Sequence, residues 1–380
     1  MKLQLNEEQR MMRDMVRNFA EKEIAPWSQE HDHEGQFPTQ LISKLAELDL
    51  MGIPIPSEYG GAAMDFLSYV LAIEEISRAS ASLGVILAVH TSVGTFPILN
   101  FGSAEQKQKY IPRLASGEII GAFALTEPNA GSDAAKIKTT AKLEGDHYRL
   151  NGSKIFITNA GHAGVYTVLA VTDKNMGVKG ISAFIVEKDT VGLKIGPPEK
   201  KLGLHSSSTC QIFFEDALVP KGNLLGKEGQ GFQIAMSLLD GGRIGIGAQA
   251  VGIARAACDA AKNYAGEREQ FGQTISDFQA IQFMLADMAT NIEAAKMLVY
   301  QAAYLKEINM PHSKQASMAK MFAADTAMKV AVDAVQVFGG YGYMQEYPVE
   351  RFLRDAKATQ IYEGTNQIQR IVIARQLLKQ

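Results

Sequence analysis

One carboxylate near the end of the chain, Glu363, stands where it could contact a ligand. It lies in the run Ile-Tyr-Glu-Gly-Thr-Asn-Gln at residues 361–367, between an aromatic ring and a glycine. A carboxylate buried beside apolar groups has a raised pKa and can act as a general base near neutral pH. Taken alone, the residue favours a bland interpretation, a solvated or helix-capping glutamate. Other residues must therefore support a proton-transfer site.

Two further runs of residues contain aromatic rings, hydroxyl groups and turn residues at the ends of expected strands. Residues 123–132 read Phe-Ala-Leu-Thr-Glu-Pro-Asn-Ala-Gly-Ser, and residues 156–159 read Phe-Ile-Thr-Asn. A strand that enters a Pro/Asn/Gly turn exposes backbone N–H groups, which can bind an anion or the edge of a heterocycle. The alternatives are an ordinary connection for the first string and a core aromatic at Phe156.

Charged and glycine-rich segments of the last third could bind phosphate. Arg268, in the run REQFG at 268–272, offers a planar fork that fits phosphate oxygens, although a surface charge is the simpler interpretation. Residues 336–340 read QVFGG, and their two glycines could equally cap a helix. Asp240 and Arg243 could form an ion pair across one helical turn.

Several classes of site are not expected. No GxGxxG follows a strand and no GxxxxGK[ST] is present, so neither common phosphate cradle applies. Cys210 and Cys258 are the only cysteines, without disulfide or metal spacing, which fits a reducing compartment. His31 and His33 lie in a polar stretch that favours a solvated turn, so no metal site is expected.

Hydrophobic periodicity predicts an α+β fold with three domains. Helical spacing occurs in the first third, at residues 6–25, 39–49, 66–87 and 104–116. Short β-rich runs follow and predict a middle barrel or sandwich. Apolar seams then predict a C-terminal four-helix bundle, with helices near 232–266, 281–299, 321–338 and 348–379. The expected domains are 1–120, 121–228 and 229–380.

Five glycines fall inside the first predicted helix of the bundle, at 241, 242, 245, 247 and 252. Each costs about 1 kcal/mol relative to alanine in a helix. Either close helix packing or the approach of a bulky ligand would offset that cost.

Charge and hydropathy argue against two kinds of partner. The net charge is −3 and no Lys/Arg cluster is present, so nucleic-acid binding is not expected. The N-terminus lacks the pattern of a signal peptide and no run of about 18 apolar residues occurs, so a cytoplasmic protein without a membrane span is expected.

Taken together, TEPNAGSD at 126–133, FITN, REQFG, QVFGG and IYEGTNQ resemble the acyl-CoA dehydrogenases over essentially the whole chain. The runs LDGGRIGIGAQA and IYEGTNQIQR are most similar to the short-chain, butyryl-CoA type. The resemblance implies an FAD flavoprotein with an N-terminal helical domain, a middle β-barrel domain and a C-terminal four-helix bundle. It also implies a homotetramer.

The resemblance also assigns roles. It implies that Glu363 removes the pro-R α-proton of a short acyl-CoA while hydride passes to flavin N5, giving the trans-2-enoyl-CoA. The Glu363 N–H and the ribityl 2′-hydroxyl would hold the thioester carbonyl. Some relatives place the acid at the position of Gly242, which cannot serve here. Many members have Trp where this chain has Phe156, a change that keeps the stacking surface.

The implied contact residues form two sets. The flavin would lie against Leu125 and Thr126 on its pyrimidine side, Thr158 near N5 and Phe156 on one face, and the segments beginning at Arg268 and Gln336 would reach the FAD of a neighbouring subunit. The full FAD set is Phe123, Ala124, Leu125, Thr126, Ser132, Phe156, Ile157, Thr158, Arg268, Phe271, Gln279, Gln336, Val337, Phe338, Gly339, Gly340, Thr365, Asn366 and Gln367. The substrate set is Ser132, Asp240, Arg243, Tyr362 and Gly364.

The expected electron acceptor is a soluble electron-transfer flavoprotein. The alternatives are a branched short-chain acyl-CoA dehydrogenase, an acyl-CoA oxidase, an enoyl-CoA reductase that uses the same residues, and a flavoprotein of this fold that protects nucleic acid. The last of these needs a basic face, which the composition does not provide.

Overall fold

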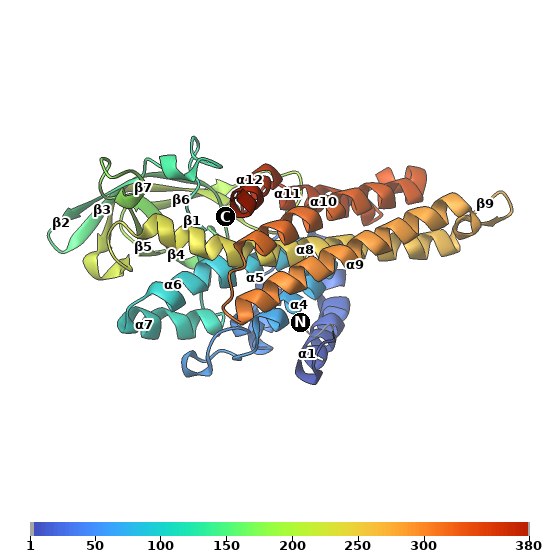
Figure 1. The fold of residues 1–380 in the computed structure, drawn as a ribbon, viewed down its shortest axis with the longest axis horizontal. Helices are drawn as coiled ribbons and strands as arrows, with labels where there is room; N and C mark the ends of the chain where they lie inside the picture. Colours follow the sequence, from blue (N-terminus) through green and yellow to red (C-terminus); the bar gives the residue numbers. More distant parts are fainter. Residues whose placement is uncertain (1–3, 379–380) are drawn as a thin grey trace.

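The computed structural model describes residues 4–378 as an elongated molecule with a β domain at one end and long helices at the other (Figure 1). The N-terminal helices lie below and between these two parts, and two long helices project beyond them on the right (Figure 1). Side chains that are close in space therefore come from segments far apart in sequence.

The N-terminal part is helical, as predicted. A capping box of Asn6 and Gln9 begins the first helix, and a π-helical turn at 20–24 joins it to the second. The predicted helix 66–87 is interrupted at Ser80, whose hydroxyl accepts from the Leu83 N–H and starts a new helix. The helices are α1 (Glu7–Phe19), α2 (Ala25–His31), α3 (Thr39–Glu47), α4 (Phe66–Ala79), α5 (Ala81–Val89), α6 (Phe96–Phe101) and α7 (Ala104–Ala115).

One helical stretch of this part, Ala81–Phe101, is long and apolar enough by composition to cross a membrane. However, 94% of its most apolar window is buried inside the protein. The described residues therefore use this stretch as a core element.

The predicted β domain is confirmed as one mixed sheet of eight strands. Its order is β6-β7-β3-β2-β4-β5-β8, with β1 parallel to β4. The rings of Tyr148 and Phe184, on strands that are not neighbours, lie 4.8 Å apart, so the sheet curls around its own apolar core. The strands are β1 (Ile120–Ala124), β2 (Thr140–Glu144), β3 (His147–Thr158), β4 (Ala163–Val171), β5 (Ile181–Glu187), β6 (Leu193–Pro198), β7 (Thr209–Pro220) and β8 (Leu224–Leu225).

The C-terminal part is a helical bundle, as predicted, but the helix expected over 348–379 is wrong. Glu363 and Gly364 have φ angles of 52° and 85°, and two left-handed residues in succession cannot continue a right-handed helix. The Thr365 hydroxyl then accepts from the Ile368 N–H and starts the next helix. The elements are α8 (Gly231–Glu267), β9 (Glu269–Gln270), β10 (Gln273–Thr274), α9 (Gln279–Glu307), α10 (Ser313–Phe338), α11 (Val349–Thr359) and α12 (Asn366–Leu378).

Close packing explains most of the glycine cluster in α8. A Cβ on Gly252 would lie 2.4 Å from the Glu74 carbonyl oxygen, and one on Gly247 would lie 2.9 Å from a methyl of Val299. These glycines therefore let α4 and α9 approach α8. Gly242 is different, because the nearest atoms belong to a side-chain carboxylate.

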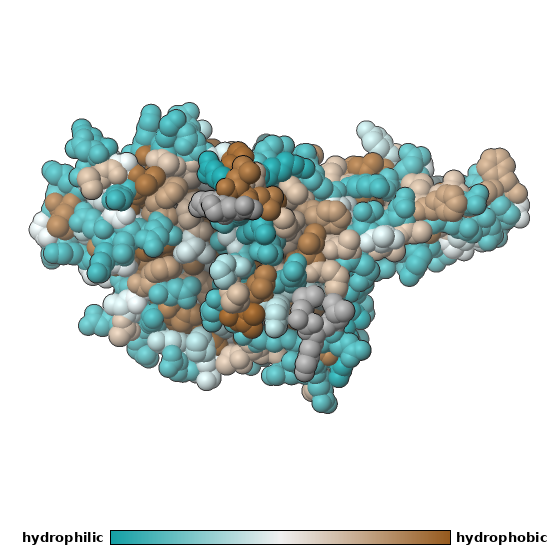
Figure 2. Space-filling model, viewed as in Figure 1, coloured by the Kyte–Doolittle hydropathy of each residue, from teal (hydrophilic) through white to brown (hydrophobic). Residues whose placement is uncertain are grey.

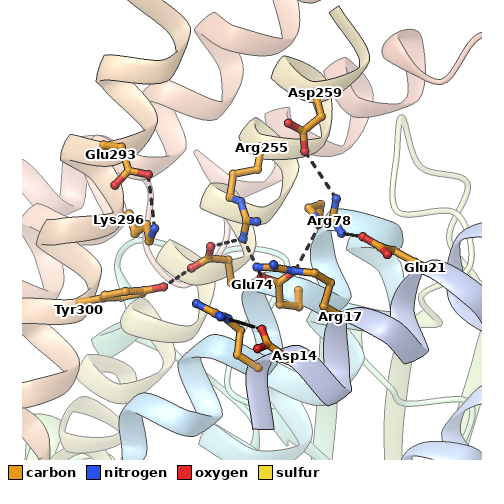
Figure 3. A network of polar contacts seen from close by, with 12 residues as sticks. Asp14, Arg17, Glu21, Glu74, Arg78, Arg255, Asp259, Glu293, Lys296 and Tyr300 are labelled. Atoms are coloured by element: carbon orange, nitrogen blue, oxygen red, sulfur yellow. Dashed lines mark hydrogen bonds and ion pairs between the residues drawn. The ribbon is translucent and has the colours of Figure 1, made fainter. Parts of the chain in front are cut away.

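Buried charges join the N-terminal helices to the bundle (Figure 3). Arg255 of α8 donates to both Glu74 and Glu75 of α4, whose side chains are 2% and 1% exposed. Tyr300 of α9 donates to Glu74 at 2.9 Å, and Arg17 of α1 pairs with Glu75 at 2.7 Å. Four helices thus share one network of compensated charge.

Candidate functional site

The carboxylate of Glu363 lies against the backbone of α8. A Cβ on Gly242 would be 2.9 Å from Glu363 Oε2, so no larger residue fits at position 242 without displacing the carboxylate. Oε2 is buried and has no hydrogen-bond partner among residues 4–378. The structure therefore brings together the two positions, 242 and 363, at which the resemblance expects the acid.

The surroundings of Glu363 favour a base that works near neutral pH. Burial raises the pKa of Glu363 to about 7, and the positive charges of Arg243 and Lys320 act in the opposite direction. A carboxyl group with this pKa holds a proton more tightly than a solvated glutamate. It is consequently the stronger base when ionised.

Side chains from α8, α10 and α12 hold the turn that carries Glu363. Lys320 Nζ donates to the Gly364 carbonyl at 2.9 Å, and Gln369 Nε2 donates to the same oxygen at 2.8 Å. The Tyr362 hydroxyl donates to Gln249 Oε1. Lys320 and Gln369 were not predicted, although a lysine facing the buried alanines at 316, 319 and 323 is an available signal.

Asn366 has a different environment from the one expected of a cofactor ligand. Its Oδ1 accepts from Lys320 at 3.0 Å, and its Nδ2 donates to Asp325 and to the Met321 carbonyl. These contacts use the amide to fasten the turn to α10. Thr365 caps α12, and Gln367 is exposed.

The two strings of the β domain lie side by side, as the resemblance implied. The Ile155 N–H donates to the Thr126 carbonyl at 2.9 Å. Strand β3 contains a bulge between Lys154 and Ile157, and there Phe156 has φ 60° and is 62% exposed. A left-handed residue costs about 1–2 kcal/mol. The backbone thus holds this ring at the surface, and the core interpretation of Phe156 is wrong.

The remaining residues of this set have unequal access. Phe123, Thr126 and Thr158 are half-buried, and Ser132 is exposed. The side chains of Ala124, Leu125 and Ile157 instead face the interior. These side chains pack in the core beneath the site, so a contact to a ligand from these positions would have to come from the backbone.

A buried ion pair that was not predicted holds the loop after β1. Lys154 Nζ donates to Glu127 Oε1 at 2.8 Å and to the Leu125 carbonyl at 3.0 Å. Glu127 also accepts from the N–H groups of Lys138 and Thr139. The lysine and the glutamate compensate each other's charge, and their hydrogen bonds to the backbone hold the loop in one conformation next to Phe156.

Both halves of the site are anchored to α5. Gln249, the acceptor of the Tyr362 hydroxyl, donates to the Ala81 carbonyl at 2.8 Å. Asn159, which follows Thr158, donates to the Ile86 carbonyl at 3.1 Å. This shared helix fixes the turn of Glu363 and the end of β3 relative to each other.

The predicted substrate residues Asp240 and Arg243 form the ion pair that was the simpler alternative. Their side chains approach to 2.7 Å, and Ser313 also donates to Asp240. Arg243 is buried, and its Nε has no partner among the described residues. The guanidinium therefore adds positive charge to the site of Glu363.

The other predicted FAD residues lie toward the projecting arm, where α8 and α10 end and α9 begins (Figure 1). Arg268 stacks on Tyr341 at 5.5 Å and lines an open hollow of about 540 Å³ with residues 337–340. Gly339, at φ 60°, ends α10, so the capping interpretation holds for this glycine. Val337 and Phe338 are buried, whereas Phe271, Gln279, Gln336 and Gly340 are exposed.

The projecting arm shows brown and tan areas among polar ones, as does the rest of this face of the molecule (Figure 2). Phe271 is 94% exposed and Tyr343 is 83% exposed. Phe156 belongs to β3 of the β domain, whereas Arg268 directly follows α8 on the projecting arm (Figure 1).

The residues present fit FAD. Phe156 offers an exposed ring beside the hydroxyls of Thr158 and Thr126, which suits stacking and hydrogen bonding to a flat heterocycle. Arg268 forms no ion pair with any residue of 4–378, so its guanidinium is available to bind a pyrophosphate. The same part of the chain contains no group of three or more His, Cys, Asp or Glu that could bind a metal.

Comparison with known proteins gives matches along almost the whole chain. Profiles described as the N-terminal, middle and C-terminal domains of acyl-CoA dehydrogenase match residues 6–118, 122–217 and 229–378. The short-chain specific acyl-CoA dehydrogenase of Clostridium acetobutylicum is 52% identical over 379 residues, covering 100% of each chain.

Two solved structures are also very similar. Butyryl-CoA dehydrogenase from Megasphaera elsdenii has a TM-score of 0.98 and 48% identity, with 100% of each chain covered. A chain in the structure described as the electron transferring flavoprotein of Acidaminococcus fermentans has a TM-score of 0.99 and 56% identity, again over 100% of both chains. The chain belongs to the acyl-CoA dehydrogenase family of FAD-dependent oxidoreductases.

Proposed function

We propose that this protein oxidises short, straight-chain acyl-CoA thioesters of the butyryl-CoA type to trans-2-enoyl-CoA, with Glu363 as the base that removes the α-proton. The observation that carries the proposal is the Glu363 carboxylate, whose Oε2 is buried, has no hydrogen-bond partner within residues 4–378, and occupies the space that a side chain at position 242 would need. The similarity to short-chain specific and butyryl-CoA enzymes supports the choice of substrate.

The turn offers a second group besides the carboxylate. No hydrogen bond from the Glu363 N–H occurs within residues 4–378, so this N–H is free to donate to the thioester carbonyl. Loss of the α-proton places negative charge on that carbonyl oxygen, and an oriented donor stabilises the charge. One residue would thus remove the proton and hold the oxygen on which charge develops.

Burial of the carboxylate serves the same step. A carboxylate in water would be a weaker base, because solvation favours its ionised form. The acyl chain would keep bulk water away from the carboxylate when it enters. The Arg243–Asp240 pair and Lys320 keep the local charge balanced while Glu363 gains and loses its proton.

FAD supplies the hydride acceptor for the β-carbon, and Phe156, Thr126 and Thr158 would hold its flavin. Arg268 and residues 336–340 would hold the rest of the cofactor from a second copy, in a homotetramer. We further infer that an electron-transfer flavoprotein receives the electrons, a choice supported by the similarity to the chain from Acidaminococcus fermentans. A cytoplasmic location fits the residues described.

The test is an anaerobic titration of the purified, FAD-loaded protein with butyryl-CoA, followed by the visible flavin band. Wild type should bleach, and Glu363→Gln should bind the thioester without bleaching. Glu58→Gln, which changes an exposed glutamate, is the matched control and should behave as wild type.

The outcomes separate the parts of the proposal. Bleaching of Glu363→Gln at the wild-type rate would exclude Glu363 as the base. A yellow wild type that binds butyryl-CoA and stays oxidised would exclude the short straight-chain assignment. Titrations with isobutyryl-CoA, isovaleryl-CoA and longer thioesters would then identify the substrate.

A further inference from the structure

Helix α10 contains a buried lysine that has no carboxylate partner in the part of the chain that the structure describes. Lys320 is 0% exposed, and its Nζ donates to two neutral acceptors, the Gly364 carbonyl at 2.9 Å and Asn366 Oδ1 at 3.0 Å. No carboxylate of residues 4–378 lies within ion-pair distance of it. Lys154 is equally buried but has Glu127 at 2.8 Å.

This difference needs an explanation, because an ammonium group without a counter-ion is costly to bury. Lys154 follows the general rule that buried charges are paired. At Lys320 the structure keeps a charge where methionine would fill similar space at lower cost. Such unusual sites are common where a charge has a functional role.

The acceptors of Lys320 lie immediately after Glu363 in the chain. Gly364 is the residue that follows it, with φ 85°, and Asn366 begins α12. Asp325, one turn further along α10, accepts from Asn366 and from Gln360 at 2.7 Å each. Both sides of the turn are consequently fastened to α10, with Lys320 at the centre.

We propose that Lys320 is a positioning residue for Glu363, which fixes the turn through the Gly364 carbonyl and favours the ionised carboxylate through its positive charge. The inference rests on the proposed role of Glu363 as the base. It assigns to one side chain both the position of the carboxylate and part of the charge that keeps it ionised.

The charged and titratable groups around Glu363 come from three helices and its own turn. Arg243 of α8 and Lys320 of α10 both lower its pKa, which burial raises. Burial raises the pKa of Tyr69 on α4 and of Tyr362 beside it, and the charge of Glu363 adds to both shifts. Neither phenol ionises in the range where Glu363 does, so Arg243 and Lys320 are the two counter-charges.

Lys320 itself titrates in the same range as the carboxylate. Burial lowers its pKa to about 7, the nearby charge of Glu363 opposes the change, Arg243 adds to it, and Asp325 opposes it. A protonated Lys320 therefore supports an ionised Glu363. Removal of the lysine charge should move the ionisation of Glu363 to higher pH.

The experiment compares Lys320→Met with wild type through the pH profile of kcat/KM for butyryl-CoA. A second readout is the pH titration of the Glu363 carboxyl band in infrared difference spectra, identified by its loss in Glu363→Gln. Lys320→Arg keeps the charge, and Lys320→Gln replaces Lys320→Met if the latter does not retain FAD. Lys329→Met, at an exposed position of the same helix, is the matched control.

We expect Lys320→Met to move the acid limb and the infrared titration upward by about one pH unit, a typical effect of one nearby charge. At pH 6 this shift alone lowers kcat/KM by about tenfold. Lys320→Arg should move both readouts back toward wild type, and Lys329→Met should leave them unchanged.

Two results would contradict different statements. Lys320→Met or Lys320→Gln could lose activity equally at all pH values while the infrared titration of Glu363 stays unchanged. That result would overturn the positioning role of Lys320 and would limit the side chain to packing. A wild type that does not oxidise butyryl-CoA, or a Glu363→Gln that does, overturns the proposed function instead.

Discussion

As the proposed base, the carboxylate of Glu363 must be ionised to accept a proton, so we expect its raised pKa to set the working pH of the enzyme. The pKa of this group is about 7, because burial disfavours its charged form. We expect kcat/KM for butyryl-CoA to fall about tenfold per pH unit below pH 7 and to level off above it. Steady-state kinetics from pH 5 to 9 measures this. An acid limb near 4.5 would mean that the carboxylate is solvated.

The same shift has a consequence for stability with a defined sign. The folded pKa of Glu363 lies above the ordinary value of 4.5. The folded state therefore loses the stability linked to this group as the pH rises from about 4.5 through 7. The activity and this part of the stability thus change in opposite directions over the same range.

The contact between Gly242 and Glu363 predicts a specific effect of one methyl group. A Cβ at 242 would lie 2.9 Å from Oε2, whereas one at Gly241 would meet only Lys306, at 3.4 Å. Both alanine variants should gain up to about 1 kcal/mol of helix stability. We expect Gly242→Ala, through misplacement of the base, to lower kcat about 100-fold. Gly241→Ala should keep the wild-type kcat, and equal kcat values for both would contradict this geometry.

Sequence reasoning found residues with a distinctive pattern and missed those defined by tertiary contacts. Glu363 and the exposed ring of Phe156 come from recognisable strings. Lys154 and Lys320 donate to backbone carbonyls 29 and 44 residues away in sequence, and no local pattern reports such a partner. The structural contacts of the Asn366 side chain with α10 could not be predicted for the same reason, and its place at the cofactor stays a prediction.

At the level of elements, periodicity predicts helices well and their interruptions poorly. The seam of α9 is confirmed, with Met288, Ile292 and Val299 buried. The break between α11 and α12 was not predicted, because a single glycine is tolerated within helical patterns. The decisive feature is the left-handed backbone of Glu363 itself, at φ 52°, which contacts with α8 and α10 maintain.

The network in Figure 3 predicts which ion pairs matter for stability. Burial alone would raise the pKa of Glu75, but Arg17 and Arg255 outweigh it and lower the pKa to about 2. We expect Arg255→Met to lower the free energy of unfolding by about 3–5 kcal/mol, because it leaves the buried Glu74 without a cationic partner among the described residues. Denaturant unfolding at fixed protein and FAD concentration, at pH 7, measures this.

The control for this experiment is an exposed pair. Lys194 and Glu215 lie 2.6 Å apart with side chains 63% and 62% exposed, and Lys194→Met should have no measurable effect. The contribution of Glu75 should be complete above pH 4.5 and lost as the pH falls toward 2. Similar unfolding midpoints for both variants would show that the buried charges are not compensated as described.

At the level of the whole molecule, Phe156 lies on β3 of the β domain and Arg268 follows α8 on the projecting arm (Figure 1), and the proposal that a second copy completes each FAD site predicts complementation between chains. Phe156→Ala and Arg268→Ala should each weaken FAD binding in homogeneous preparations. In an oligomer that contains both variants, some sites combine the intact β domain of one chain with the intact arm of the other. We expect such hybrids, purified through two tags, to regain a class of sites with wild-type FAD affinity.

The matching control is a hybrid in which both replacements are on the same chain and the partner is wild type. If each FAD site forms across that pair of chains, every site in this hybrid carries one replacement. None of its sites should then bind FAD with wild-type affinity. Wild-type affinity here, together with none in the first hybrid, would show that each FAD site is built within one chain.

The burial of Ala81–Phe101 has a consequence for the order in which the protein can mature. This stretch is apolar enough to span a bilayer, and one of its partners in the folded state, Gln249 of α8, is synthesised well over a hundred residues later. On the ribosome the stretch emerges before the helix that covers it, and exposed apolar segments of this kind promote aggregation. The nascent chain thus passes through a vulnerable interval in which chaperones have a natural target.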